Sequence, residues 1–458
     1  MANLIILASV NLDWSPIRTV APYQLASWLR QHDYTVKVID FCHLMSTTDL
    51  VEIIEKNIDT STLAIGVSST FWNNNPIIQV YEPAWIIDAR KIIDSRYTLP
   101  WLLGGAASNF SSRLLQWRKF HGNAEDSLLK WMDENSSKLK HRELFNIQTL
   151  TKSFLEDDLI RPDEALPIEL GRGCQFKCRF CSYPLIGKKK GTYLRDFGLI
   201  KDEFLRNYEE WGTTRYYFQD DTVNESEEKI RALADIAQSL PFKLEWTGYN
   251  RLDLIWSRPG TIQMLKDSGL RSAFFGIESF HPVASMAVGK GWSGKHGKDF
   301  LLKLKKEWND EITWTLSFII GLPGEDRKSI DESVKWCIDN EMYNWGFHPL
   351  YINNSPGKLW KSEFDIDYKK YGYTILDGTF DMWKNDLWTR AEAVEYSNKI
   401  SVLSDPYCKP TCWLLSDLAG LGYTYEELMI HHRIDLDWSE FNRRTTDIIQ
   451  KYVNHQLR

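Results

Sequence analysis

The chain has 458 residues, of which 43% are hydrophobic and 26% charged, and its formal net charge is -7. This composition is typical of a globular protein of about three domains, and the negative charge disfavours indiscriminate binding to nucleic-acid phosphates. No apolar run approaches the ~18 residues of a membrane-spanning helix, and the apolar start of the chain lacks the basic flank of a signal peptide. We therefore expect a cytoplasmic protein without membrane contact.

The first 125 residues alternate apolar strands with amphipathic helices. The expected strands are LIILASV, TVKVIDF, TLAIGVSST and PWLLGGAAS, and helical patterns lie between them. Unbroken apolar strands separated by helices predict a parallel sheet covered on both faces. We expect a doubly wound, Rossmann-like α/β domain over 1–125, with ligands at the carboxyl ends of its strands.

A second run of strands and helices follows a polar connector predicted for 126–160. Its six candidate strands are LPIELG, RYYFQD, KLEWTGY, SAFFGIE, TWTLSFII and NWGFHPL. Six strand–helix repeats predict a partial, open (β/α)6 barrel over 161–356, with its chemistry at the C-terminal ends of the strands. The remaining residues, 357–458, have a mixed, mainly helical pattern, and we expect them to cap the substrate.

Three cysteines, Cys174, Cys178 and Cys181, directly follow the first barrel strand with the spacing C-x3-C-x2-C. A structural zinc site needs four ligands, and the nearest downstream histidine is His281; a disulfide would use only two thiols. The chain has seven cysteines in all, and an odd number with three clustered indicates metal ligands. Three thiolates on a short loop suit a [4Fe-4S] cluster whose fourth iron stays open.

The cysteine spacing resembles that of the radical S-adenosylmethionine (SAM) superfamily. Phe180 matches the aromatic residue that these enzymes place against the adenine of SAM. Five further segments resemble the family's strand ends in the expected order: FQDDTVNES, WTGYNRLDLI, LKDSGLRSAFFGIESF, SFIIGLPGED and HPLYINNSPGKLW. Val223 stands where the family usually has an aromatic residue, and Lys358 where it usually has threonine. The resemblance covers 167–360 and implies an enzyme that cleaves SAM reductively to methionine and a 5'-deoxyadenosyl radical.

The resemblance also implies which residues bind the cofactors of the barrel. The three cysteines would hold the cluster, and SAM would chelate its open iron. Carboxylates and a hydroxyl at strand ends suit the ribose hydroxyls and the ammonium of SAM. The candidate SAM contacts are Phe180, Asp220, Asp221, Arg251, Glu278 and Ser279. A helix N-cap is the alternative role for the two aspartates, and a structural salt bridge is the alternative for Arg251.

Within the superfamily, a doubly wound domain ahead of the barrel marks the cobalamin-dependent subgroup. Small residues at strand ends let the backbone lie against a flat corrin ring. The candidate cobalamin contacts are Asn11, Ser68, Ser69, Thr70, Gly104, Gly105 and Ala106. The chain has no Asp-x-His-x-x-Gly motif, and only Gly122, Glu125 and Asp126 remain of an acidic segment usual in the family. A front domain that serves only for packing or substrate docking is the alternative.

These features together predict a cobalamin-dependent radical SAM C-methyltransferase acting on an unactivated carbon. One alternative is radical rearrangement, cyclisation or oxidation without methyl transfer. Another is a non-catalytic iron–sulfur protein that senses redox state or binds a partner. The sequence does not indicate whether the substrate is a small molecule or a peptide.

Three smaller signals each leave two interpretations open. Lys177, Arg179 and GKKKG (187–191) form either a docking collar for an acidic electron donor, such as flavodoxin or ferredoxin, or a solvated loop. Cys408 and Cys412 either bind an auxiliary metal or pack in the core. The aromatic stretch 371–390 either caps the barrel mouth or belongs to the core.

Overall fold

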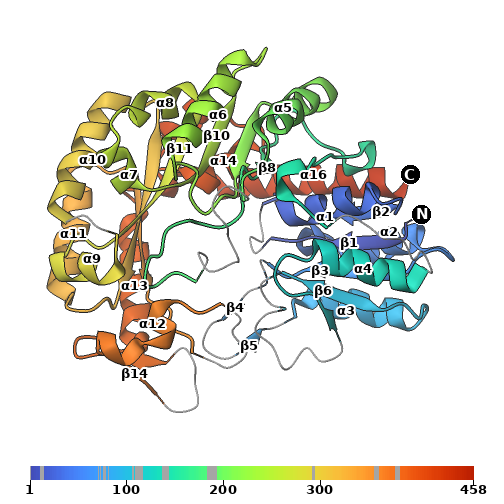
Figure 1. The fold of residues 1–458 in the computed structure, drawn as a ribbon, viewed down its shortest axis with the longest axis horizontal. Coiled ribbons are helices and arrows are strands. Elements are labelled where there is room, and N and C mark those ends of the chain that lie inside the picture. Colours follow the sequence, from blue (N-terminus) through green and yellow to red (C-terminus); the bar gives the residue numbers. More distant parts are fainter. Residues whose placement is uncertain are drawn as a thin grey trace. The chain divides into compact units, whose positions relative to one another are not determined.

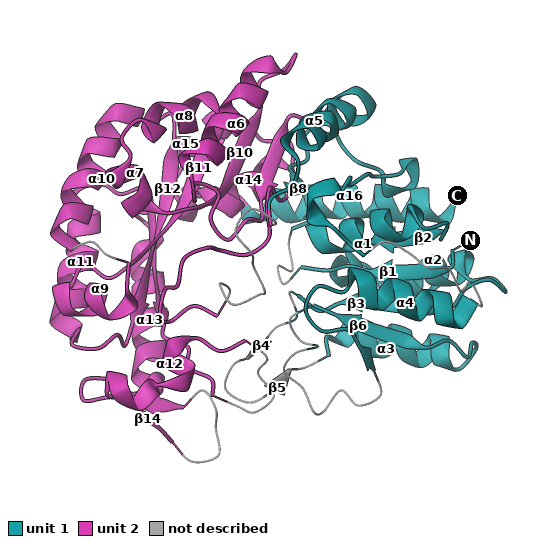
Figure 2. Cartoon of the chain, viewed as in Figure 1, with its two compact units in different colours: residues 1–167, 194–213, 438–458 teal, residues 168–193, 214–437 magenta. Residues whose placement is uncertain are grey.

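The computed structural model describes residues 2–10, 15–70, 72, 74–75, 79–80, 82–105, 108, 117–136, 144–182, 193–290, 294–354, 360–376 and 382–458. The chain forms two compact units (Figure 2). The first contains residues 1–167, 194–213 and 438–458, and the second contains 168–193 and 214–437. No helix in these described ranges is long and apolar enough to cross a membrane.

The first unit has a parallel sheet of five strands in the order β2-β1-β3-β6-β7. The strands are β1 (Leu4–Leu7), β2 (Val36–Ile39), β3 (Ala64–Ser68), β6 (Trp101–Gly104) and β7 (Arg118–Lys119). The helices are α1 (Val20–Arg30), α2 (Thr47–Asn57), α3 (Ala84–Asp94), α4 (Glu125–Ser136), α5 (Phe197–Trp211) and α16 (Trp438–Leu457) (Figure 1). The strand order reverses at β1, as in doubly wound folds, so the predicted Rossmann-like architecture is confirmed. The short strand β7 is an addition to the four predicted strands.

The first unit extends beyond the predicted boundary at residue 125. Ile449, Tyr452 and Val453 of α16 belong to the same hydrophobic core as β1 and β3. The hydroxyl of Tyr452 accepts a hydrogen bond of 3.0 Å from the backbone N–H of Asp40. The last helix, predicted to help cap the substrate, therefore instead completes the first unit, and the predicted connector 126–160 belongs to this unit as well.

The second unit has a sheet of six strands in the sequential order β13-β12-β11-β10-β9-β8, and the strand pairs from β9 to β13 are parallel. The strands are β8 (Leu166–Ile168), β9 (Arg215–Phe218), β10 (Glu245–Asn250), β11 (Leu270–Glu278), β12 (Thr313–Ile320) and β13 (Asn344–Pro349). The helices between them are α6 (Glu227–Ser239), α7 (Leu252–Ser257), α8 (Thr261–Asp267), α9 (Pro282–Val288), α10 (Gly294–Trp308) and α11 (Arg327–Asp339). This arrangement is the predicted open barrel, with consecutive strands as neighbours (Figure 1).

One of the helices after the barrel closes its N-terminal end. Four elements precede α16: α12 (Glu363–Ile366), α13 (Arg390–Ser404), α14 (Cys412–Ala419) and α15 (Tyr425–Met429). The Ser416 hydroxyl of α14 lies 2.7 Å from that of Thr247 in β10, and the Cys412 N–H donates to Ser272 of β11 at 2.8 Å. Both partners lie in the first half of their strands. Helix α14 therefore lies at the opposite end of the barrel from the one predicted for 357–458, whereas the Phe364 N–H of α12 donates to the Arg179 carbonyl of the cysteine loop.

The aromatic stretch after β13 lies at the C-terminal end of the barrel. Trp383 donates from its indole to the Leu350 carbonyl at 2.9 Å, and Tyr373 donates to the Gly321 carbonyl at 2.8 Å. Gly321, directly after β12, has a φ of +97°, and the ring of Trp383 leaves no space for a Cβ there. The described residues of the stretch therefore close off part of this end by core packing.

Candidate functional site

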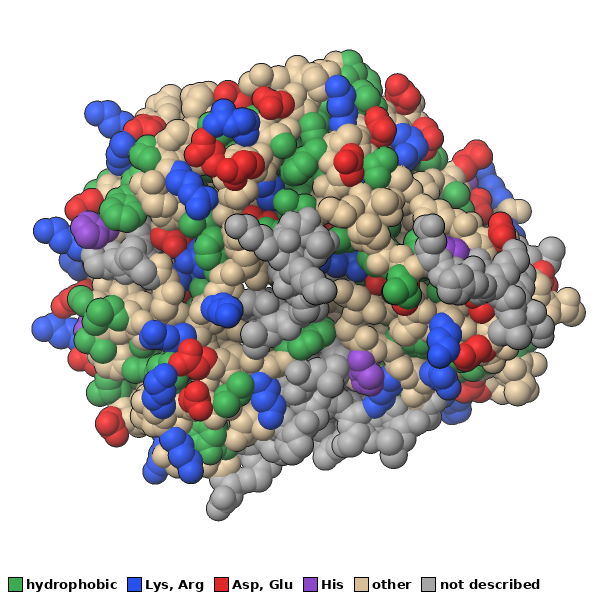
Figure 3. Space-filling model, in the orientation of Figure 1, with side chains coloured by type: hydrophobic (Ala, Val, Ile, Leu, Met, Phe, Trp, Pro, Cys, Tyr) green, Lys and Arg blue, Asp and Glu red, His purple; other side chains and the backbone are tan. Residues whose placement is uncertain are grey.

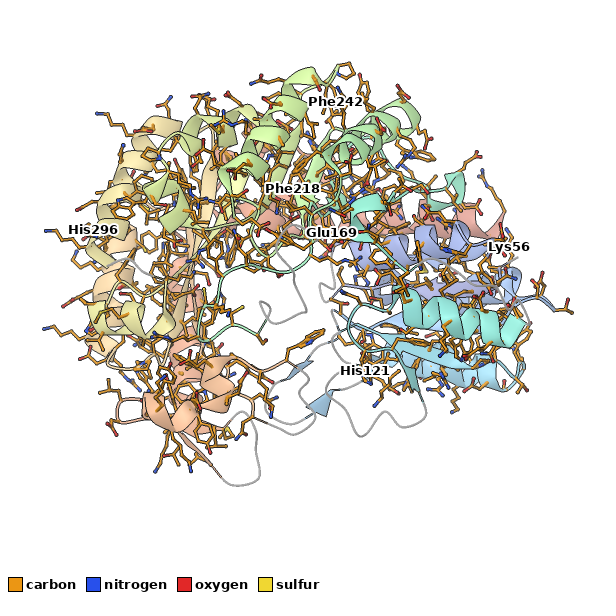
Figure 4. All side chains as sticks on the ribbon, viewed as in Figure 1. Lys56, His121, Glu169, Phe218, Phe242 and His296 are labelled. Atoms are coloured by element: carbon orange, nitrogen blue, oxygen red, sulfur yellow. The ribbon has the colours of Figure 1, made fainter. Side chains whose placement is uncertain are left out.

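The loops that follow β8, β9 and β10 converge on the three cysteines. Figure 4 labels Glu169, the first residue after β8, and Phe218, the last residue of β9, from which two of these loops start. The thiol of Cys174 lies 3.3 Å from the Thr222 hydroxyl in the loop after β9. The thiol of Cys178 accepts a hydrogen bond of 3.2 Å from Arg251, directly after β10. The loops after β8, β9 and β10 therefore meet at the cysteines, as expected for chemistry at the C-terminal ends of the strands.

Arg251 is held against the cysteine loop by three kinds of contact. Its guanidinium donates to both carboxylate oxygens of Asp253, at 3.1 and 2.6 Å, and lies 4.2 Å from the centre of the Phe176 ring. A planar guanidinium can make a bidentate ion pair, stack on a ring and donate to sulfur at once, which a lysine cannot. These contacts place a fixed cation 3.2 Å from the Cys178 sulfur. The position of Arg251 thus suits the cluster loop more directly than the predicted carboxylate of SAM.

The carboxylate of Asp220 already has partners from the protein on both oxygens. It accepts from Lys229 of α6 at 2.7 Å and from the backbone N–H of Leu170 at 2.8 Å, and all these groups are buried. Burial raises the pKa of Asp220, and the attraction to Lys229 opposes that rise. Asp220 therefore ties β9 to the start of the cysteine loop, and we leave it out of the candidate SAM contacts. Asp221 is half-buried beside it.

Glu278 ends β11 in a strained conformation at the other side of the barrel. Its φ is +66°, and the register between β11 and β12 shifts at this point. Its carboxylate accepts a hydrogen bond of 2.6 Å from Lys290, and both side chains are buried. Lys290 bonds to Oε1 only, so the carboxylate can accept from a ligand hydroxyl or ammonium through its second oxygen, which distinguishes Glu278 from Asp220. Lys290 is a site residue that the sequence reasoning did not single out.

Ser279 is paired with a second carboxyl group that the sequence reasoning did not select. Its hydroxyl donates to Oε1 of Glu325, after β12, at 2.6 Å and accepts from the His281 N–H at 2.8 Å. Glu325 is 2% exposed, and its Oε2 has no hydrogen-bond partner among the described residues. Burial raises the pKa of Glu325 to about 8. A carboxylic acid at this position can be neutral near pH 7 and still hold Ser279.

The cysteine loop offers a donor set that fits an iron–sulfur cluster. Its three thiols are half-buried, and cluster iron prefers thiolate ligands. Among the described residues, no three His, Cys, Asp or Glu side chains converge as they would on a single metal ion. A [4Fe-4S] cluster binds each thiolate through a different iron atom and so does not need that convergence.

The candidate cobalamin residues that the structure describes lie at the ends of two neighbouring strands. Ser68 of β3 is in register with Gly104 of β6, and Ser69 donates from its hydroxyl to the Gly104 carbonyl at 2.5 Å. Among the residues that the structure describes, a Cβ on Gly104 would meet nothing within 4 Å, whereas one on Gly105 would lie 2.6 Å from the Thr70 nitrogen. Gly104 therefore leaves open space beside the strand ends, as the approach of a flat ligand requires, and Gly105 with its φ of +88° serves the turn.

Several predicted residues lie outside the described part of the chain. These are Asn11, Ala106, GKKKG (187–191) and Lys358. Arg179 is described, and it donates to the carbonyls of Met286 and Ala287 at the end of α9. Cys408 and Cys412 are buried, and burial raises the pKa of both thiols, so ordinary packing accounts for them.

Comparison with known proteins identifies the second unit. The model of the radical SAM superfamily matches residues 168–337. An uncharacterized methyltransferase of Pyrococcus horikoshii is 27% identical over 166 residues, which are 36% of this chain and 35% of that protein. An anaerobic magnesium-protoporphyrin IX monomethyl ester cyclase of Cereibacter sphaeroides is 22% identical over 214 residues, 46% of this chain and 34% of the cyclase. The matched segments thus span about a third of the length of these relatives.

Two solved structures resemble the chain over almost its whole length. The radical SAM methyltransferase TsrM from Kitasatospora setae, solved with cobalamin and a [4Fe-4S] cluster, has a TM-score of 0.66 at 15% identity and covers 98% of this chain and 100% of TsrM. The cobalamin-dependent radical SAM enzyme OxsB, solved with aqua-cobalamin and SAM, has a TM-score of 0.64 at 14% identity and covers 100% of this chain and 72% of OxsB. Residues 168–337 therefore match the radical SAM superfamily, and the chain has the fold seen in TsrM and OxsB.

Proposed function

We propose that this protein cleaves SAM reductively at a [4Fe-4S] cluster held by Cys174, Cys178 and Cys181. The observation that carries this proposal is the loop after β8, whose three thiols meet Thr222 and Arg251 from the next two strand ends. When bound, the cluster supplies the one electron that breaks the sulfonium–C5' bond of SAM, giving methionine and the 5'-deoxyadenosyl radical. A reductant such as flavodoxin or ferredoxin would provide that electron.

The protein's own side chains would bind and orient SAM around this loop. Glu278 offers a buried carboxylate for the ribose hydroxyls or the ammonium, with Lys290 holding it in place. Ser279, fixed by Glu325, and the half-buried Asp221 and Phe180 complete the proposed contacts. Closure of these groups around the reacting atoms would also exclude water, which protects a radical from side reactions.

We further propose that the first unit binds cobalamin and that the reaction is C-methylation of an unactivated carbon. Three findings support this proposal: the open space at Gly104, the fold shared with TsrM and OxsB over nearly the whole chain, and a relative named as a methyltransferase. Bound cobalamin would supply a carrier for the methyl group. Ser68, Thr70, Gly104 and Gly105 would line its site.

The similarity to the cyclase of Cereibacter sphaeroides favours one second candidate. In that case the radical chemistry would end in cyclisation or oxidation, and no methyl group would be transferred. The two candidates predict different products from SAM. Methyl transfer consumes one SAM to S-adenosylhomocysteine for each substrate methylated, whereas cyclisation or oxidation yields none.

Anaerobic reconstitution with iron, sulfide and hydroxocobalamin, followed by desalting and a visible spectrum, tests the assignment. We expect iron–sulfur absorption together with retained corrin bands at about one corrin per chain, and S-adenosylhomocysteine on turnover with dithionite. A cluster without retained corrin, and without S-adenosylhomocysteine, would instead favour the second candidate and leave the first unit as a scaffold.

A further inference from the structure

The strands of the barrel have one face toward the surrounding helices and one toward the barrel interior. On β11, Phe275 is fully buried on the helix side, where its ring lies 6.5 Å from that of Trp308 in α10. Successive side chains of a strand point to opposite faces, so Phe274 points into the interior. Tyr249 of β10 is in register with Phe274 and shares its face.

Three aromatic rings meet at this level of the interior. The ring of Tyr249 lies 4.9 Å from that of Phe274, and Trp413 of α14 lies 4.5 Å from Tyr249 and 4.9 Å from Phe274. We call Tyr249, Phe274 and Trp413 the aromatic floor. Centroid distances of 4.5–7 Å are typical of aromatic pairs that attract each other, so the three rings form one cluster.

The aromatic floor is anchored from below by hydroxyl contacts between α14 and the strands. Thr247 pairs with Ser416, Ser272 accepts from the Cys412 N–H, and the hydroxyl of Thr315 lies 2.7 Å from that of Thr411. Thr247 and Ser272 come two residues before Tyr249 and Phe274 on their strands, and Thr315 is in register with Phe274. These contacts hold the start of α14, and with it Trp413, against the strands.

At the next level toward the site, three neighbouring strands carry small residues. Gly276 of β11 is in register with Ser317 of β12, which is in register with Gly346 of β13. A Cβ on Gly276 would lie 2.5 Å from Oε1 of Glu278 and 2.8 Å from Nζ of Lys290. The Glu278–Lys290 pair therefore overhangs a layer of small residues, and that layer lies directly above the aromatic floor.

The rings of the aromatic floor keep accessible surface although they lie inside the barrel. Tyr249 is 37% exposed, and Phe274 and Trp413 are half-buried, while aromatic residues on the helix side such as Phe275 and Trp246 are fully buried. Accessible faces and edges of aromatic rings favour contact with a planar aromatic partner.

We propose that the aromatic floor binds a planar aromatic group of the substrate and directs its polar part toward the strand ends above the floor. This inference rests on the proposed radical SAM function, since it assigns the substrate class of that site. The three rings are specificity-determining residues, because they choose the group that stacks on them.

Saturation-transfer NMR on the full, anaerobically reconstituted chain tests this assignment with two probes of matched size. The aromatic probe is 2-naphthylmethanol, and its saturated counterpart is decahydro-2-naphthylmethanol. Phe274→Leu removes one ring of the floor, and Phe275→Leu makes the same change on the helix face of the same strand. An aromatic pair contributes about 0.5–1.5 kcal/mol, so Phe274→Leu should weaken binding of the aromatic probe roughly two- to tenfold.

We expect Phe275→Leu to lower the melting temperature and to bind the aromatic probe as the wild type does. The saturated probe should bind more weakly than the aromatic one to the wild type. Equal affinity of wild type and Phe274→Leu for 2-naphthylmethanol, or equal affinity of the wild type for both probes, would overturn the inference. The measurement needs neither SAM nor reductant, so a failure of radical chemistry would be seen separately, in the SAM-cleavage assay.

Discussion

The buried carboxyl group of Glu325 connects two strand ends of the site. It accepts from Ser279, and its second oxygen lacks a partner among the described residues. Desolvation raises its pKa to about 8, opposed by the Ser279 hydrogen bond and reinforced by the nearby charge of Asp326. A group whose pKa is higher in the folded than in the unfolded state binds more protons when folded.

The stability contributed by Glu325 is therefore present below the ordinary carboxyl pKa of 4.5 and is lost as pH rises toward about 8. Glu325→Gln keeps a neutral side chain that can hold Ser279 at every pH. We expect the wild type to lose stability relative to this variant by a few kcal/mol, as an order of magnitude, between pH 5 and 8. Melting temperatures at pH 5, 6.5 and 8 measure the difference. As a control, Glu332→Gln on the exposed face of α11 should show the same dependence of melting temperature on pH as the wild type. If the melting temperatures of Glu325→Gln and wild type changed in parallel with pH, this role of Glu325 would be contradicted.

Arg251 makes its contacts through the shape of the guanidinium as well as through its charge. Arg251→Lys keeps the charge but cannot reach Cys178, Asp253 and the Phe176 ring together. We expect Arg251→Ala to retain several-fold less iron than wild type after reconstitution and desalting, with Arg251→Lys between them. Iron content per chain is the readout. Full iron retention in Arg251→Ala would mean that the arginine does not support the cluster loop.

At the scale of elements, the two glycines at the end of β6, Gly104 and Gly105, should respond in opposite ways to substitution. Gly104 has open space beside it, so Gly104→Val should keep the melting temperature and lower corrin retention by about tenfold through steric exclusion. Gly105 has a φ of +88° and the Thr70 backbone against it, so Gly105→Ala should destabilise the unit by about 1–3 kcal/mol. Corrin retention after desalting and thermal melts measure both effects. Unchanged corrin retention in Gly104→Val would remove the β6 end from the cobalamin site.

The strands and the cysteine loop could be predicted from the sequence because local patterns determine them. Apolar runs marked all six barrel strands, and C-x3-C-x2-C marked the loop after β8. Pairs such as Glu278–Lys290 and Ser279–Glu325 could not be predicted, because they depend on how far each loop folds back over the strand ends. The packing of α14 under the barrel could not be predicted either. An apolar helical pattern shows that one face of a helix is buried, but it does not show which element that face packs against.

At the scale of the whole molecule, the two ends of the chain meet in the first unit. Tyr452 contacts Asp40 across 412 positions of sequence, and Lys56 donates to the Gln456 carbonyl at 2.9 Å. The buried Arg18 pairs with Asp40 at 2.6 Å and also with Glu164, which joins three distant segments. The sequence alone could not place α16, because its amphipathic pattern suits either unit. Charges of both signs intermingle on the face in Figure 3, in keeping with the small net charge.

Removal of residues 438–458 should therefore destabilise the first unit rather than only shorten the chain. The deletion takes Ile449, Tyr452 and Val453 out of the core, and each buried aromatic or aliphatic side chain lost from a core costs about 2–5 kcal/mol. We expect the truncated chain to lose protection from hydrogen exchange in β1, β2 and β3 while β10, β11 and β12 stay protected. Tyr452→Phe should give a milder form of the same effect, because it removes only the contact with Asp40. Unchanged exchange in β1 to β3 after truncation would show that α16 is dispensable.

The central claim is that the cysteine loop holds a cluster that cleaves SAM. The most direct test is anaerobic incubation of the reconstituted full chain with SAM and dithionite, with 5'-deoxyadenosine and methionine measured by mass spectrometry. We predict both products from the wild type and at least a hundredfold less from Cys174→Ala, Cys178→Ala and Cys181→Ala. Absence of 5'-deoxyadenosine from a wild-type chain that carries its cluster, or equal yields from the cysteine variants, would contradict the assignment.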